Sequence, residues 1–181
     1  MQIAWRVDEY IRALHFAGKA HSGQEIPGSG LPFIVHLSSV SLEVISAMMV
    51  EPEHDGDLMI KCALLHDVLE DTKVTYDQVK SEFDVRVADG VKALTKNSEI
   101  EKTLQMVECL ARIQKQPQEI WMVKLADRIV NLQPPPSYWT PERRSQYLEQ
   151  SKEIYEALKV ASQFLATRLL SKIQDYKQYC S

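Results

Sequence analysis

The sequence has little of what builds linkers, disulfide frameworks or membrane spans. It contains six glycines and eight prolines in 181 residues, which argues against long flexible linkers and favours a single domain over residues 1–181. Its three cysteines, Cys62, Cys109 and Cys180, show no C-x-x-C spacing, which is typical of a reducing cytoplasmic setting. No apolar run reaches the roughly eighteen residues of a membrane span, and residues 1–10 are too charged for a signal peptide.

An excess of positive charge is also missing. The formal net charge is −4 at pH 7, whereas proteins that neutralise nucleic-acid phosphates usually carry more Lys and Arg than Asp and Glu. We therefore expect no nucleic-acid partner and no membrane partner. A local basic pocket for a small anion remains compatible with this composition.

Helical periodicity is abundant. The apolar spacing and the capping residues predict helices over residues 2–21, 37–49, 57–70, 75–83, 85–95, 99–115, 118–131, 141–160 and 162–177. The turn-rich EIPGSGLP cannot continue a helix, and the FIV after it can form a short strand or hairpin arm. The proline run 134–136 interrupts the series, and Thr140-Pro141-Glu142 restarts it. The predicted fold class is all-α, with a small β-hairpin or irregular insertion near residues 24–35.

The stretch ALLHDVLEDT (63–72) places an imidazole and three carboxylates among apolar residues. On a continuous helix, His66 and Glu70 share one face, and Asp67 and Asp71 share another. Burying ionised groups costs several kcal/mol each unless a cation or hydrogen bonds satisfy them. A metal site is one interpretation, and a solvated helix end that carries Glu70 and Asp71 is the other.

Two further stretches favour the metal. PFIVHL contains His36, and WMVKLADRIVNL contains Asp127, with Asn131 one turn later. Taken alone, His36 is equally typical of a core histidine, and Asp127 could simply pair with Lys124 or Arg128. Taken together, two imidazoles and two carboxylates suit Mn²⁺, Fe²⁺ or Zn²⁺, and the carboxylates favour Mn²⁺. The absence of thiolates argues against a closed structural zinc site.

The H…HD…D set on an all-α frame resembles the HD-domain metal-dependent phosphohydrolases, which form a helical bundle. The motifs AHSGQ (20–24), PFIVH (32–36), LLHDVLEDT (64–72), LTK (94–96) and VKLADRIVNL (123–132) more closely resemble the hydrolase domain of RelA/SpoT homologues. The likeness covers about residues 10–160, and the chain is similar to a stand-alone small alarmone hydrolase. The resemblance implies that Mn²⁺ is bound by His36, His66, Asp67 and Asp127.

The same resemblance implies roles for other residues. Glu70 and Asp71 match the acidic pair that orients and deprotonates the attacking water. Asn131 matches a residue that contacts the substrate near the metal. Lys102, Arg143 and Tyr147 fall near positions that contact phosphate or ribose, although Lys102 alone is more typical of a solvated surface lysine. The implied reaction removes the 3′-pyrophosphate from guanosine tetra- or pentaphosphate, a small nucleotide.

The chain departs from this family where the base would be held. Ile26-Pro27 replaces an Arg-Lys pair, Leu37 replaces a proline, and Gln133-Pro134 replaces the usual residues after the NL pair. Isoleucine cannot stack and donate as arginine does. The sequence therefore does not decide whether the substrate base is guanine, as in (p)ppGpp, or adenine, as in (p)ppApp. NADPH, cleaved at its 2′-phosphate, is a further alternative.

Two other functional classes remain. One is a broader HD phosphohydrolase acting on nucleoside monophosphates or cyclic nucleotides. The other is a nucleotide-sensing module without turnover, which would need a broken ligand set, whereas all six metal and acidic positions are present. Apolar residues near the C-terminus, Ile154, Leu158, Phe164 and Leu169, favour the core and leave a homodimer face open.

Overall fold

The structure is a computed structural model that describes residues 5–180. Regular structure in this part of the chain is helical, and the predicted all-α class is confirmed. The helices are α1 (Val7–Ala20), α2 (Ile34–Met48), α3 (Gly56–Leu65), α4 (Val68–Asp71), α5 (Tyr76–Glu82), α6 (Val85–Leu94), α7 (Gln105–Ile113), α8 (Gln118–Asn131), α9 (Pro141–Leu158) and α10 (Gln163–Tyr176). The short 3₁₀ helices η1 (Lys159–Ala161) and η2 (Lys177–Tyr179) follow α9 and α10.

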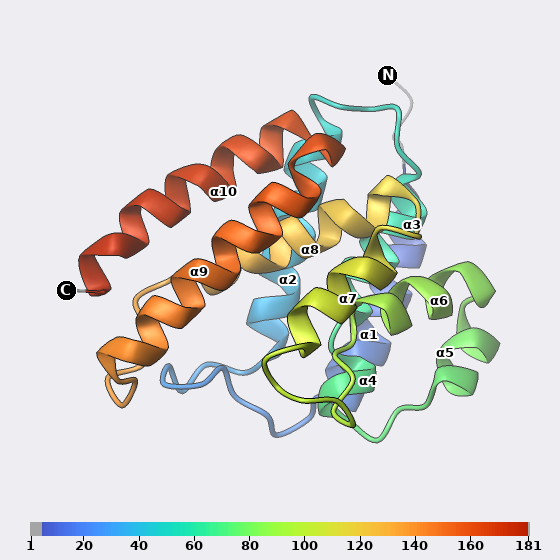
Figure 1. Cartoon of the computed structure of the whole chain (residues 1–181). Coiled ribbons are helices and arrows are strands. Elements are labelled where there is room, and N and C mark those ends of the chain that lie inside the picture. The colour runs from blue at the N-terminus through green and yellow to red at the C-terminus, as the bar shows by residue number, and fades with distance from the viewer. Residues whose placement is uncertain (1–4, 181) are drawn as a thin grey trace.

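Helix α8 lies in the middle of the molecule (Figure 1). It contacts α2, α3, α9 and α10, while α1 packs on α3, and α6 lies against α3 and α7. Helices α9 and α10 run side by side along one flank, and α5, α6 and α7 occupy the other (Figure 1). One hydrophobic core joins these helices. Among the described residues, no helix combines the length and the apolar character that crossing a lipid bilayer requires.

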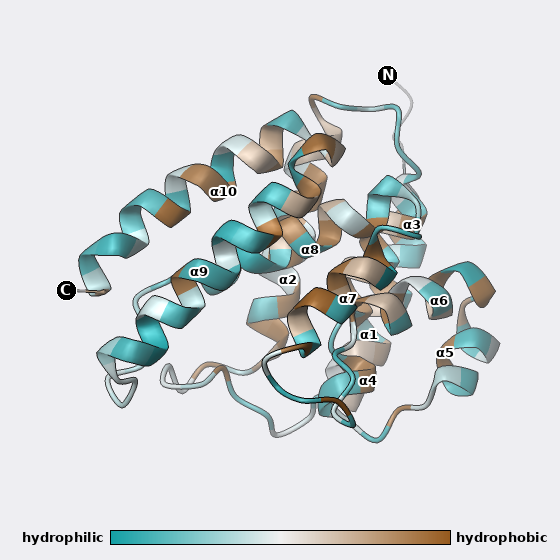
Figure 2. Ribbon diagram, viewed as in Figure 1, coloured by the Kyte–Doolittle hydropathy of each residue, from teal (hydrophilic) through white to brown (hydrophobic). Residues whose placement is uncertain are grey.

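Helix α9 shows how the sequence pattern directs burial. Its buried residues are Leu148, Ser151, Ile154 and Leu158, a spacing of three or four that keeps them on one face. The remainder of the helix is largely hydrophilic, as Figure 2 shows. Ile154, Leu158 and Leu169 are fully buried and Phe164 is partly buried, so these residues belong to the core, as favoured from the sequence.

Side-chain caps fix several helix starts. Asp55 accepts a hydrogen bond from the Leu58 amide at α3, Thr75 forms a capping box with Gln78 at α5, and Thr140 caps α9 ahead of Pro141. These caps satisfy amides that the first helical turn leaves unpaired. They agree with the predicted starts.

The insertion before α2 is irregular, one of the two forms predicted for residues 24–35. An isolated antiparallel bridge joins Glu25 and Pro32, and the Ile26 amide donates to the Leu31 carbonyl. Gly28 and Gly30 have φ of 79° and 70°, values that favour glycine. The prediction of a strand or hairpin arm at FIV is wrong, because Phe33 is the N-cap residue of α2 and Ile34 and Val35 are helical. A short apolar run fits either structure.

The predicted helix over residues 57–70 is also wrong in one respect, because it breaks between α3 and α4. His66 ends α3, and Asp67, with φ −101° and ψ −3°, precedes α4. The shared faces expected for His66 with Glu70 and for Asp67 with Asp71 therefore do not apply. Helix α7 likewise begins at Gln105, later than the predicted residue 99.

Candidate metal centre

Four side chains from three parts of the fold converge in the interior. His36 lies in the first turn of α2, His66 and Asp67 lie at the break between α3 and α4, and Asp127 lies in α8. The Nε2 atoms of His36 and His66 are 3.2 Å apart. Asp67 Oδ2 lies 3.0 Å from His66 Nε2 and 3.6 Å from His36 Nε2. Asp127 Oδ1 lies 3.5 Å and 3.6 Å from the same two nitrogens.

The break between α3 and α4 orients the His66 ring toward the cluster. Its Nδ1 lies 2.8 Å from the Ala63 carbonyl oxygen, and because a carbonyl can only accept, Nδ1 carries the proton. In a continuous α-helix that carbonyl would receive the Asp67 amide. The imidazole takes this acceptor, and its Nε2 faces the cluster. Such a bond from the second ring nitrogen is common for metal-binding histidines.

Asp127 is held on both of its oxygens. Lys124, one turn earlier on α8, places Nζ 3.0 Å from Oδ2, and the Asn131 amide donates to Oδ1. Lys124 and Asp127 are both buried. The pairing with Lys124 considered from the sequence is therefore present together with the cluster. Arg128 instead lies over the Tyr147 ring, 4.2 Å from its centroid.

The electrostatics of the cluster favour a positive charge between the rings. Burial lowers the pKa of His36, and the neighbouring His66 lowers it further. Burial acts to lower the pKa of His66 as well, but Asp67 and Asp127 raise it well above its ordinary value. Burial would raise the pKa of Asp127, yet Lys124 and His66 hold it well below its usual range. Two carboxylates thus draw a cation toward the histidine nitrogens.

The donor set fits a divalent metal ion. His36, His66 and Asp67 each offer one ligand atom, and these atoms lie within 4.8 Å of one another. Ligand atoms about 2.0–2.2 Å from one ion lie about 3.0–3.5 Å apart, close to the distances among the two imidazoles and the nearer carboxylate oxygens. Asp127 Oδ1 lies 3.6 Å from His36 Nε2 and 3.5 Å from His66 Nε2, which is close to this spacing. Nitrogen and oxygen donors of this kind suit Mn²⁺, Fe²⁺ or Zn²⁺.

The acidic pair of α4 follows Asp67 directly. Glu70 bonds to Lys96 in the segment after α6, and the Asp71 carbonyl accepts a hydrogen bond of 2.6 Å from Gln24 Nε2. Burial raises the pKa of Asp71, and the charges of Asp67 and Glu70 raise it further. The structure thus links both acidic residues to segments far away in the sequence. No role for Lys96 or Gln24 could be predicted from the sequence, where the one signal is that they occur in the motifs LTK and AHSGQ.

Arg143 and Tyr147 share a neighbour. The Arg143 guanidinium lies 4.4 Å from the centre of the Trp139 ring, and that ring lies 5.1 Å from the Tyr147 ring. Arg143 is exposed, whereas Tyr147 is partly buried. Lys102 lies in an exposed turn before α7, and within residues 5–180 no hydrogen bond or ion pair joins it to the four-residue cluster. The structure does not bring Lys102 together with the others.

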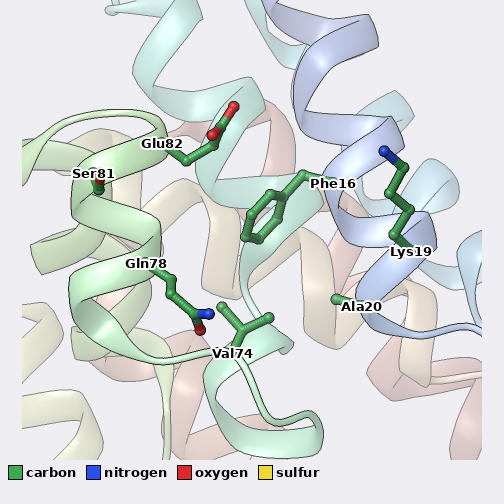
Figure 3. A pocket seen from close by; sticks show the side chains of 7 residues that line it. All are labelled: Phe16, Lys19, Ala20, Val74, Gln78, Ser81 and Glu82. Atoms are coloured by element: carbon green, nitrogen blue, oxygen red, sulfur yellow. The ribbon is translucent and has the colours of Figure 1, made fainter.

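A hollow of about 510 Å³ lies elsewhere, between α1 and α5 (Figure 3). Phe16 and Lys19 of α1 line one side, and Gln78, Ser81 and Glu82 of α5 line the other. None of the four clustered residues contributes to it. With no imidazole and a single carboxylate, this hollow lacks the donors of a metal centre.

Comparison with known proteins identifies the family of this chain. The family model described as HD domain matches residues 13–163. The guanosine-3′,5′-bis(diphosphate) 3′-pyrophosphohydrolase MESH1 of Danio rerio is 29% identical over 161 residues, covering 82% of this chain and 83% of the relative. The Aquifex aeolicus protein named guanosine-3′,5′-bis(diphosphate) 3′-pyrophosphohydrolase is 31% identical over 156 residues, or 83% of this chain. This chain spans only 21% of the Aquifex protein.

A solved structure has a similar fold. It is a metazoan ortholog of SpoT, described as hydrolysing ppGpp, and it superposes with a TM-score of 0.81 at 26% identity. The alignment covers 94% of this chain and 97% of that chain. The family model covers most of the sequence and includes all four clustered residues. The chain therefore belongs to the HD-domain family.

Proposed function

We propose that this protein is a Mn²⁺-dependent hydrolase that removes the 3′-pyrophosphate from alarmone nucleotides, (p)ppGpp or (p)ppApp. The products are pyrophosphate and the nucleoside 5′-di- or triphosphate. The observation that carries the proposal is the convergence of His36 and His66 with Asp67 and Asp127, directly beside Glu70 and Asp71. The names of the relatives from Danio rerio and Aquifex aeolicus support the reaction type.

In this proposal His36, His66, Asp67 and Asp127 hold the metal. A bound divalent ion lowers the pKa of water and polarises a phosphoryl oxygen. Lys124 and Asn131 orient Asp127 through its two oxygens. Residues 1–181 act as one phosphohydrolase domain.

Glu70 and Asp71 orient the attacking water and accept its proton. Both belong to α4, which begins directly after Asp67. The water oxygen bonds to the phosphorus attached to the 3′ oxygen as the bond between that phosphorus and the 3′ oxygen breaks. Pyrophosphate leaves with the water oxygen, and the 3′ oxygen takes up a proton to become the 3′-hydroxyl. Arg143, Tyr147 and Lys102 are proposed contacts for phosphate or ribose, and Asn131 for substrate near the metal. The shared contact of Arg143 and Tyr147 with Trp139 supports the first two.

The base is proposed to be held without an arginine. No Lys or Arg occurs between Lys19 and Lys61, so the insertion before α2 offers no cation to a purine. An ideal Cβ at Gly28 would lie 3.0 Å from Pro136 Cβ, which places the insertion against the proline run. The two segments that carry the departures from the family therefore lie side by side. Because no cation is present in the insertion to distinguish the bases, we propose (p)ppApp as a substrate together with (p)ppGpp.

Product analysis in the presence of Mn²⁺ tests the proposal. We would offer ppGpp, ppApp and NADPH separately at equal concentration and measure pyrophosphate and phosphate. Pyrophosphate release from either alarmone supports the proposal, and the ratio of the two rates gives the base preference. Phosphate release from NADPH alone would replace the alarmone activity with a broader phosphatase. If metal binds and no nucleotide is cleaved, a sensing module replaces the enzyme.

A further inference from the structure

Lys96 holds Glu70 with two separate donors. Its backbone amide donates to Glu70 Oε2 at 2.9 Å, and its Nζ donates to Oε1 at 2.8 Å. One residue therefore engages both oxygens and fixes the carboxylate plane. The side chains are 38% and 26% exposed, so solvent weakens the ion pair. The Lys96–Glu70 contact is therefore more important for the orientation of the carboxylate than for the stability of the fold.

The position of Lys96 is itself fixed by α7. The Arg112 guanidinium donates to the carbonyls of Lys92, Ala93 and Thr95 at the end of α6. Glu108, one turn earlier on α7, accepts from the same guanidinium. The last carbonyls of a helix lack partners within it, and the five donors of arginine can satisfy several at once. The chain therefore leaves α6 in one direction and places Lys96 against Glu70.

The two bonds leave room for chemistry at Glu70. A carboxylate offers about four lone-pair positions, and Lys96 takes one on each oxygen. The remaining positions can accept a water proton. A group that moves a proton works only within hydrogen-bond reach, and an error of about 1 Å can cost up to about a hundredfold in rate. Fixing the carboxylate plane is therefore relevant to turnover.

We propose that Lys96 is a positioning residue for Glu70 in the hydrolytic reaction. This inference rests on the proposed function, because it gives Glu70 a part in activating water. The competing role is direct binding of a substrate phosphate by the Lys96 ammonium. The geometry favours positioning, because the amide and the ammonium of Lys96 both point at the same carboxylate.

A double-mutant cycle distinguishes these roles. The variants are Lys96→Ala, Lys96→Arg, Glu70→Gln and the pair Lys96→Ala with Glu70→Gln. Lys92→Ala is the matched control, because Lys92 is an exposed lysine near the end of α6 whose side chain lies over Tyr76 instead. For each variant we would measure kcat, KM and Mn²⁺ affinity with the alarmone that the wild type cleaves.

Positioning predicts a fall in kcat of about tenfold for Lys96→Ala. The loss is smaller than for Glu70→Gln because the backbone amide still holds Oε2. KM and Mn²⁺ affinity stay unchanged, Lys96→Arg restores most of kcat, and Lys92→Ala matches the wild type. Adding Lys96→Ala to Glu70→Gln causes no further loss, since the lysine acts through the missing carboxylate.

Two results would overturn the inference while leaving the proposed function intact. One is wild-type kcat in Lys96→Ala. The other is a raised KM that persists in the Glu70→Gln background, which would make Lys96 a phosphate ligand. If the wild type itself cleaves neither alarmone, the proposed function fails first, and the role of Lys96 fails with it.

Discussion

The Nε2 atoms of His36 and His66 lie 3.2 Å apart, although one ring comes from the start of α2 and the other from the end of α3. His66 already donates through Nδ1 to the Ala63 carbonyl, so its Nε2 is free to act as a ligand. Two carboxylate oxygens lie within 3.6 Å of the rings. This arrangement makes metal binding the first property to test.

Removing Asp67 should weaken metal binding strongly and reduce turnover with it. Asp67 Oδ2 is 3.0 Å from His66 Nε2, and loss of even an outer partner costs roughly 10–100-fold in metal affinity or activity. We expect Asp67→Ala to weaken Mn²⁺ binding by at least about a hundredfold, measured by isothermal titration calorimetry. Asp77→Ala, an exposed change in the first turn of α5, should bind like the wild type. Full Mn²⁺ affinity in Asp67→Ala would remove this residue from the ligand set.

Glu70→Gln should separate metal binding from turnover. The amide keeps the shape of the side chain, and its single oxygen can accept one of the two hydrogen bonds from Lys96, but it is a poor proton acceptor. We expect Mn²⁺ affinity to stay unchanged and kcat to fall by roughly a hundredfold, within the range for a positioned acid–base group. Pyrophosphate release in steady state is the measurement. An unaltered rate would exclude Glu70 from the proton transfer.

Chelation should lower thermal stability. Metal that binds only the folded chain contributes about 2.7 kcal/mol at a concentration about a hundred times Kd, which corresponds to about 5–10 °C in Tm for a chain of this size. We expect EDTA to lower Tm by about this amount and Mn²⁺ to restore it. Differential scanning fluorimetry gives the shift. Asp67→Ala should show no response to EDTA, and an equal response in that variant would mean that the ion binds elsewhere.

Gly90 should be intolerant of a side chain. An added Cβ would lie 2.6 Å from Ile120 Cδ1 and 2.9 Å from Cys62 Sγ, so α6 would have to move from α3 and α8. We expect Gly90→Ala to lower the free energy of unfolding by about 1–3 kcal/mol, as overpacking does. Urea unfolding monitored by circular dichroism measures the change.

Two further variants control this prediction. Ile120→Val removes the nearest atom, so it should recover part of the loss in the Gly90→Ala background. In α1, Gly18→Ala meets its nearest neighbour, Ile34 Cδ1, at an ordinary 3.7 Å, and should stabilise the protein by about 0.5–1 kcal/mol. Destabilisation by both alanine changes would point to a general cost of replacing glycine in this fold.

The helices could be predicted well where capping chemistry marks their ends. Thr75, Thr140 and Asp55 are recognisable cap residues, and all three cap helices. The break at His66–Asp67 could not be predicted, because no proline or glycine occurs there. At this break the His66 side chain donates to the Ala63 carbonyl, which would otherwise accept a backbone amide of the helix. That hydrogen bond is visible only in the three-dimensional structure. FIV was misassigned because three apolar residues carry no period.

The clustered residues could be predicted because their spacing matches a family pattern and because buried charges need partners. Their supporting residues could not. Lys124 was considered only as an alternative partner for Asp127, whereas the structure places it on the oxygen facing away from the histidines. Lys96 contacts Glu70 across 26 positions of sequence. A contact of that separation leaves no periodic trace in a single chain.

The interrupted helix has a consequence for protein design. Adjacent residues of a continuous helix point about 100° apart, yet His66 and Asp67 reach one point because the backbone turns between them. A designer who copied the His-Asp pair onto an unbroken helix would reproduce the chemistry and lose the geometry. The portable unit is the end of one helix and the start of the next.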